Sequence, residues 1–159
     1  MNQFFLEFNT MPKSTAQQKR YNGRTRTYFK DARLMETEKE FYYALKPYAP
    51  KEPSLAPIKL SIWFYFDIKD KKKWKQPKVS KPDVDNYSKA FIDQMAKVGF
   101  FVDDSQIVSL HLEKFYAEKA SIVVRWEEWK EDKYGSEFAR MQAEHDEIMR
   151  RPIGGAEND

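Results

Sequence analysis

Aspartates gather in one short stretch of the sequence, between residues 83 and 104. Asp83 and Asp85 stand at the start of a segment with helical periodicity, and Asp104 follows the end of that segment. Carboxylate oxygens are the ligands that Mg²⁺ prefers, and three aspartates brought together would repel each other without a cation. These residue types therefore predict a divalent-cation site that offers a polarised water to a phosphodiester. The alternative for Asp83 or Asp85 is a simple helix N-cap, which the helix dipole also favours.

Lys89 adds a cation to this acidic group, one helical turn after Asp85. The expected helix buries an apolar stripe, and Lys89 points away from that stripe at 100° per residue. It either pairs with Asp85 as an ordinary ion pair or reaches a phosphate. Asp93 and Asp103 are further acids nearby, and the sequence does not decide whether either assists the metal site or whether Asp103 outranks Asp104.

Positive charge is concentrated in two separate segments. Residues 11–30 carry six bases and no acid, and residues 69–81 carry seven lysines against one acid. The net charge is only +3 because residues 127–159 hold ten acids and five bases. A basic body indicates a polyanionic partner, although a single lysine run is as often a solvated loop. The candidate DNA contacts are Lys13, Lys19, Arg20, Arg24, Arg26, Lys71, Lys72, Lys73, Lys75 and Lys81.

Aromatic residues stand among these bases. Tyr21, Tyr28, Phe29 and Trp74 could stack on unpaired nucleotide bases. Partial burial in the core is the alternative for each of them, and it is stronger for Phe29 than for Trp74.

Several protein classes are excluded or disfavoured by composition. Cysteine is absent, which excludes disulfides and thiolate-bound zinc. There is no apolar run long enough to span a bilayer, and the N-terminus lacks the basic and apolar segments of a signal peptide. We therefore expect a cytoplasmic protein without a membrane partner.

The elements that must position these residues predict an α+β domain. Alternation of apolar and polar residues predicts strands over 4–8, 58–66, 107–116 and 121–126. The last two are expected to form an antiparallel hairpin. Asn22-Gly23 predicts another hairpin with a two-residue loop. The expected fold is a mixed or antiparallel sheet packed against two helices.

Those two helices have clear end signals. Asp31 can cap a helix that Pro47 stops, and a second helix over 84–98 ends before Gly99. From about Trp129 to Arg151 the chain has helical periodicity, with a break expected near Gly135. The expected organisation is one α+β domain over 1–128, which the family resemblance described next implies to be a nuclease domain, and an acidic helical extension over 129–159.

This arrangement resembles the RusA family of Holliday-junction resolvases over about residues 3–126. The basic segment before residue 30 is similar only loosely. The resemblance is carried by Lys81-Pro82-Asp83-Val84-Asp85-Asn86, Lys89, Asp93, the run from Gly99 to Ile107, and Glu113-Lys114.

The resemblance implies a homodimeric, Mg²⁺-dependent endonuclease for DNA recombination and repair, in which Mn²⁺ could substitute. Such an enzyme binds four-way junctions and nicks two strands symmetrically, and a two-fold dimer would supply two equivalent sites. The family's metal-binding and catalytic carboxylates fall on Asp83, Asp85 and Asp104, and its functional lysine falls on Lys89.

Three rival functions remain at this point. The first is a DNA-binding module without catalysis, which the intact set of aspartates disfavours. The second is a metal-dependent phosphohydrolase of small nucleotides, which the spread of basic charge over two segments disfavours. In the third, the acidic segment after Trp129 recruits a protein partner and the nuclease is incidental.

Overall fold

The computed structural model describes residues 1–13 and 19–150. The chain divides into two compact units, Met1–Glu128 and Trp129–Asp159. Within the described residues, none of the helices combines the length and the apolar character that a membrane span requires.

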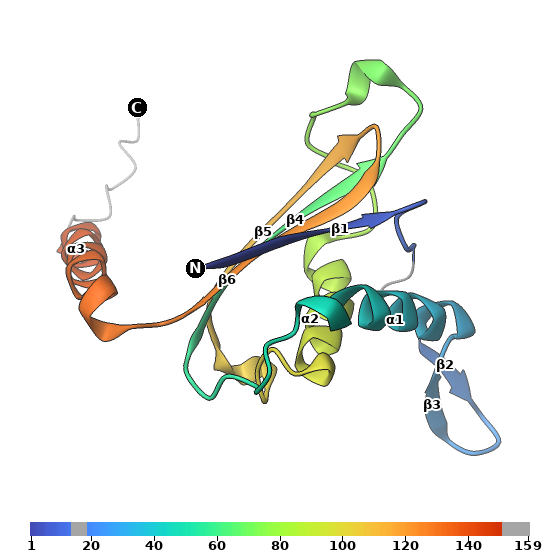
Figure 1. The fold of residues 1–159 in the computed structure, drawn as a ribbon, viewed down its shortest axis with the longest axis horizontal. Helices are drawn as coiled ribbons and strands as arrows, with labels where there is room; N and C mark the ends of the chain where they lie inside the picture. The colour runs from blue at the N-terminus through green and yellow to red at the C-terminus, as the bar shows by residue number, and fades with distance from the viewer. Residues whose placement is uncertain (14–18, 151–159) are drawn as a thin grey trace, which may run out of the picture. The chain divides into compact units, whose positions relative to one another are not determined.

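A four-stranded mixed sheet forms the centre of the first unit (Figure 1). Its spatial order is β1-β6-β4-β5. β4 pairs with β6 in antiparallel fashion and with β5 in parallel, and β1 pairs with β6 in antiparallel fashion. The sheet and the helices confirm the expected α+β fold. The strand bounds are β1 (Asn2–Phe8), β4 (Ile58–Asp67), β5 (Ile107–Ala117) and β6 (Ala120–Glu128).

The predicted hairpin of the last two strands is wrong. β5 and β6 follow each other in the chain, but β4 lies between them and pairs with both. Every second residue of β4 is buried, and a central place gives this apolar strand hydrogen-bonding partners along both edges. Periodicity predicts that a segment is a strand but not which strand lies beside it.

Two helices cover one face of this sheet (Figure 1). α1 (Ala32–Leu45) begins after Asp31, whose carboxylate accepts a hydrogen bond from the Arg33 amide at 2.8 Å. α2 (Val84–Val98) ends at Gly99, which has a φ of 102° in the left-handed region. Glycine adopts this conformation without the strain that a side chain would add. Both helices have the positions that the sequence predicts.

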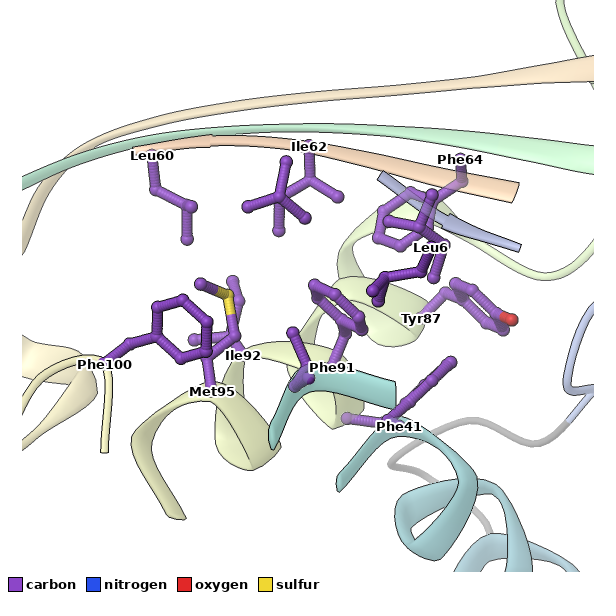
Figure 2. Packing of buried hydrophobic residues seen from close by; sticks show 14 of the residues in the cluster. Leu6, Phe41, Leu60, Ile62, Phe64, Tyr87, Phe91, Ile92, Met95 and Phe100 are labelled. Atoms are coloured by element: carbon purple, nitrogen blue, oxygen red, sulfur yellow. The ribbon is translucent and has the colours of Figure 1, made fainter. Parts of the chain in front are cut away.

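The core lies between the sheet and these helices. Figure 2 shows Leu60, Ile62 and Phe64 of β4 pointing toward Phe91 and Met95 of α2, and all five side chains are fully buried. Each such burial stabilises the fold by about 1.5–3 kcal/mol. α2 is therefore held firmly against the sheet, which fixes the position of its acidic N-terminus.

A basic hairpin, β2 (Lys19–Asn22) and β3 (Thr27–Lys30), forms a separate two-stranded sheet. Its loop is longer than the two residues predicted, because Asn22 pairs directly with Thr27. The side-chain oxygen of Asn22 accepts hydrogen bonds from the amides of Arg24 and Thr25, at 3.0 and 3.3 Å. Asn22 is thus the last residue of β2, and its side chain stabilises the loop without being part of it.

The second unit contains α3 (Glu131–Arg150). The break expected near Gly135 is absent, because the helix runs through this residue. A single glycine inside a helix costs only about 1 kcal/mol relative to alanine, and strong helix formers such as Glu, Ala, Met and Arg surround it.

Candidate functional site

The N-terminus of α2 presents the first two candidate aspartates. Asp83 occupies the N-cap position, yet its side chain makes no capping hydrogen bond. Asp85 lies in the first turn of the helix. Both side chains are exposed. The Asp83 side chain therefore does not cap the helix, so helix capping does not explain this carboxylate as a purely structural group.

Asp83 faces a hollow of about 540 Å³, called here the Asp83 hollow. Its lining combines this carboxylate with the amide of Asn86 and the phenol of Tyr116. Asp67 also lines the hollow, so its wall carries two carboxylates and three lysines, and these lysines can bind a phosphate group. The lysines are Lys13, Lys78 and Lys81.

Asp85 and Asp104 face a second hollow of about 320 Å³, called here the Asp104 hollow. Lys89 and Asp93 also line it, and the rest of the wall is largely apolar. Asp83 and Asp85 face different hollows because residues two apart on a helix point about 200° away from each other.

Asp103 and Asp104, which the sequence could not rank, have different roles in the structure. Asp103 caps the short 3-10 turn Asp104–Gln106: its carboxylate accepts from the Ser105 amide at 2.8 Å, and the Gln106 side chain accepts from the Asp103 amide at 3.0 Å. The hydrogen bonds from Ser105 hold the pKa of Asp103 below its usual value. Asp104 is left to line the hollow. The Asp-x-x-Gln spacing of a capping box was the sequence signal for this difference.

Asp93 lines the Asp104 hollow and interacts electrostatically with the other charged side chains there. Burial raises the pKa of this carboxyl, and the nearby negative charge of Asp104 raises it further. Lys89 and Lys97 act in the opposite direction. A bound cation would relieve this repulsion, so the Asp104 hollow has the electrostatic character of a cation site.

The carboxylate oxygens around the Asp104 hollow are of the type that Mg²⁺ binds. Mg²⁺ commonly takes one or two carboxylates and completes its octahedron with waters and phosphate oxygens. Asp85, Asp93 and Asp104 provide such oxygens around one hollow. Among the side chains that the structure describes, however, no three acidic or histidine groups are close enough together to hold an ion by themselves. The predicted ligands Asp83, Asp85 and Asp104 therefore lie at the start of α2 and just before β5 without forming a closed cage.

The lysine-rich loop after β4 is tied to the edge of β5. Pro77 forms a bridge with Phe115, and the amide of Lys78 donates to the Lys114 carbonyl at 3.0 Å. The Lys114 ammonium in turn donates to the carbonyls of Ser80 and Pro82, at 2.8 and 2.6 Å. Burial, and next the positive charge of Lys78, lower the pKa of Lys114.

The sequence placed Lys78 only in the lysine-rich segment and Lys114 only in the RusA resemblance, and it assigned neither of them, nor Tyr116, to the site. The signal was present in the alternation of β5, where Leu110, Leu112, Lys114 and Tyr116 share the face that carries the core of the sheet. A lysine in the middle of such a series is unusual and calls for a polar partner.

The candidate DNA contacts lie mostly at exposed positions. Lys71, Lys72 and Lys73 form an exposed 3-10 turn that Asp70 caps, and Lys75 follows it. Arg24 and Arg26 lie in the exposed loop of the hairpin. Lys13 and Lys81 lie on the Asp83 hollow. The side chains of Lys19, Arg20 and Phe29 fall outside the described part of the structure.

The aromatic candidates differ from one another. Tyr21 and Tyr28 are 55 % and 72 % exposed, with ring centroids 5.1 Å apart on the hairpin. Trp74 is half-buried, and its indole N–H donates to the Ile68 carbonyl at 2.9 Å. The hairpin tyrosines are thus better placed for stacking on nucleotide bases than Trp74, which anchors the lysine-rich loop.

Comparison with known proteins gives two matches. The sequence model of the family described as Endodeoxyribonuclease RusA matches residues 8–127. The chain is also 36 % identical over 124 residues to a crossover junction endodeoxyribonuclease rusA from Lactococcus phage r1t. That alignment covers 77 % of this chain and 94 % of the phage protein. The family match includes both hollows and ends before α3 begins.

Proposed function

Because the chain belongs to the RusA family of endodeoxyribonucleases, we propose that it is a Mg²⁺-dependent nuclease that resolves four-way DNA junctions. It would bind the junction and resolve it by paired symmetric nicks, during DNA recombination and repair. The observation that carries this proposal is the pair of hollows at the N-terminus of α2. One hollow combines Asp83 and Asp67 with three lysines, and the other brings Asp85 and Asp104 together with Lys89.

The aspartates serve as the metal ligands in this proposal. Asp83, Asp85 and Asp104 would hold the ion, with waters and a phosphate oxygen completing its coordination. Because Asp83 faces the other hollow, its carboxylate would have to turn toward Asp85 and Asp104 when the ion binds. When bound, the ion polarises a water for attack on the phosphodiester. Mn²⁺ is expected to replace Mg²⁺ because it accepts the same oxygen ligands.

The lysines of the site bind and orient the DNA strand. Lys89 faces the Asp104 hollow and would hold the scissile phosphate or stabilise the charge that develops on it. Lys13, Lys78 and Lys81 line the Asp83 hollow and supply donors for the neighbouring backbone phosphates.

We further propose that the enzyme acts as a homodimer. A four-way junction has two-fold symmetry at its crossover, and symmetric nicks in two opposed strands need two equivalent sites. A C₂ dimer provides the two-fold symmetry and the two equivalent sites through a single kind of interface.

The acidic segment 129–159 is expected to stay away from the junction. Residues 127–159 hold twice as many acids as bases, and negative side chains interact poorly with phosphates. Attachment of a protein partner is the proposed alternative role for this segment.

The function is tested with a synthetic four-way junction labelled on each of its strands and incubated with Mg²⁺ or Mn²⁺. Nicks at symmetric positions in two opposed strands support the proposal. Junction binding without nicks indicates a DNA-binding module instead. Hydrolysis of free nucleotides with an intact junction indicates a phosphohydrolase.

Replacing Lys71, Lys72 and Lys73 with glutamine should weaken junction binding and flatten its dependence on salt. All three side chains are exposed on the same turn. Removing one lysine–phosphate interaction on a duplex arm reduces the slope of log K against log [salt] by about 0.9. The slope is measured by titrating labelled junction at several salt concentrations.

The matched control replaces Lys39, Lys46 and Lys51, which are exposed on and just after α1. It removes the same net charge from another surface and should change the slope less. Equal slopes in the two triple variants would mean that the turn 71–73 is only a solvated loop.

A further inference from the structure

Lys114 stands at the boundary between the two hollows. On β5 it points to the same side as Leu112 and Tyr116, because side chains two apart share a face of a strand. Leu112 lines the Asp104 hollow, and Tyr116 lines the Asp83 hollow. Lys114 lies between these two residues in the strand and is half-buried, and it does not itself line either hollow.

The hydrogen bonds of Lys114 converge on the segment that leads into α2. Its ammonium nitrogen donates to the Ser80 carbonyl at 2.8 Å and to the Pro82 carbonyl at 2.6 Å. Pro82 immediately precedes Asp83. Hydrogen bonds from a charged donor are roughly twice as strong as neutral ones. The main chain of the last residues before the helix is therefore held by one side chain of β5.

Neighbouring hydrogen bonds support the same segment. The amide of Tyr116 donates to the Gln76 carbonyl at 2.9 Å, and the Lys75 amide donates to the Tyr116 carbonyl at 2.8 Å. The Ser80 hydroxyl lies 2.9 Å from the Tyr116 hydroxyl and accepts a hydrogen bond from Lys78 at 2.6 Å. The loop is thus fixed to β5 from residue 75 onward, and Lys114 provides its last attachment before the helix.

Asp83 needs such support from outside the helix. A helix N-cap side chain usually fixes the entry of the chain by accepting a hydrogen bond from the first turn. The Asp83 side chain makes no such bond, which leaves its carboxylate available but its direction unfixed by the helix. The carbonyls of Ser80 and Pro82, held by Lys114, fix the backbone immediately before it.

We infer that Lys114 is a positioning residue of the nuclease site, which orients the Asp83 carboxylate by holding the carbonyls of Ser80 and Pro82. The inference rests on the proposed function, because it concerns how the proposed metal ligand is presented. Residues that orient a metal ligand typically change metal affinity or activity by about 10–100-fold when they are replaced.

The test compares Lys114→Met with Lys119→Met. Lys119 is exposed in the turn after β5, so its replacement removes the same charge without touching the segment 80–83. Hydrogen exchange of peptides covering residues 78–87 is measured without metal, and Mn²⁺ binding to the protein alone is measured by calorimetry. Lys114→Met should exchange faster in these peptides and bind Mn²⁺ about 10–100-fold more weakly. Lys119→Met should match the wild type in both measurements.

Lys114→Arg keeps the charge and the donors, and it should retain more Mn²⁺ affinity than Lys114→Met. If the methionine variant is poorly folded, Lys114→Gln takes its place, because glutamine removes the charge and shortens the reach to the two carbonyls. Weaker Mn²⁺ binding in Lys114→Gln than in Lys114→Arg supports the inference, and equal binding in the two variants overturns it. Wild-type exchange and wild-type Mn²⁺ affinity in a folded Lys114→Met would overturn it, as would faster exchange with unchanged Mn²⁺ affinity. Failure of the wild type to nick a junction would refute the proposed function separately, because neither measurement uses DNA.

Discussion

Asp83→Asn and Asp104→Asn are each expected to abolish junction cleavage while sparing junction binding. The amide keeps the size of the side chain but removes the charge that binds the cation. The loss should exceed the ~10–100-fold that follows from removing a residue behind a metal ligand. Junction binding should stay the same or become tighter, because less negative charge faces the phosphates. Single-turnover cleavage and titration of labelled junction measure the two effects separately.

Asp103→Asn is the matched control for this pair. Asp103 is adjacent to Asp104 but caps a turn, and asparagine caps a helical turn about as well as aspartate. The control variant should therefore cleave at nearly the wild-type rate. Normal nicking by Asp83→Asn or Asp104→Asn would remove that residue from the metal site, and loss of nicking in Asp103→Asn would show that the structural distinction between Asp103 and Asp104 is wrong.

Lys89→Ala is expected to lower the single-turnover cleavage rate by ~10²–10³-fold, the usual effect of losing one donor aimed at developing charge. Lys89 is exposed on α2 and faces the Asp104 hollow, so its removal should leave the fold intact. Junction affinity should change little, because many other bases are available to bind the backbone. The rate is measured at saturating enzyme, and the affinity is measured in Ca²⁺ or without metal.

Lys97→Ala provides the comparison on the same helix. Lys97 is also exposed and also interacts with Asp93, but it does not line the Asp104 hollow. It should therefore cleave normally. A fall in junction affinity without a fall in rate for Lys89→Ala would reduce Lys89 to a residue that only binds the DNA backbone.

Local signals predicted the elements that carry the site. The bounds of α2 follow from its apolar stripe and from Gly99, and the start of α1 follows from Asp31. Such signals act within one or two helical turns, so a single sequence contains them. The capping box of Asp103 and Gln106 is equally local, but it does not enter the prediction from the sequence, which leaves the choice between Asp103 and Asp104 open.

Contacts between distant segments could not be predicted in this way. The insertion of β4 between β5 and β6 depends on which strand buries most apolar surface when the whole sheet forms. The hydrogen bonds of Lys114 to Ser80 and Pro82 join residues more than 30 positions apart. Neither relation leaves a periodic pattern in the chain.

The raised pKa of Asp93 has a consequence for folding. Burial and the charge of Asp104 favour the protonated form of Asp93 in the folded chain, so its ionisation at neutral pH opposes folding. This contribution to stability is present below the usual pKa of an aspartate and is lost as the pH rises through the higher folded value. A divalent cation that binds only the folded state would offset the loss by mass action. The protein would then carry a built-in trade-off, in which the crowded carboxylates that attract the ion weaken the fold until the ion arrives.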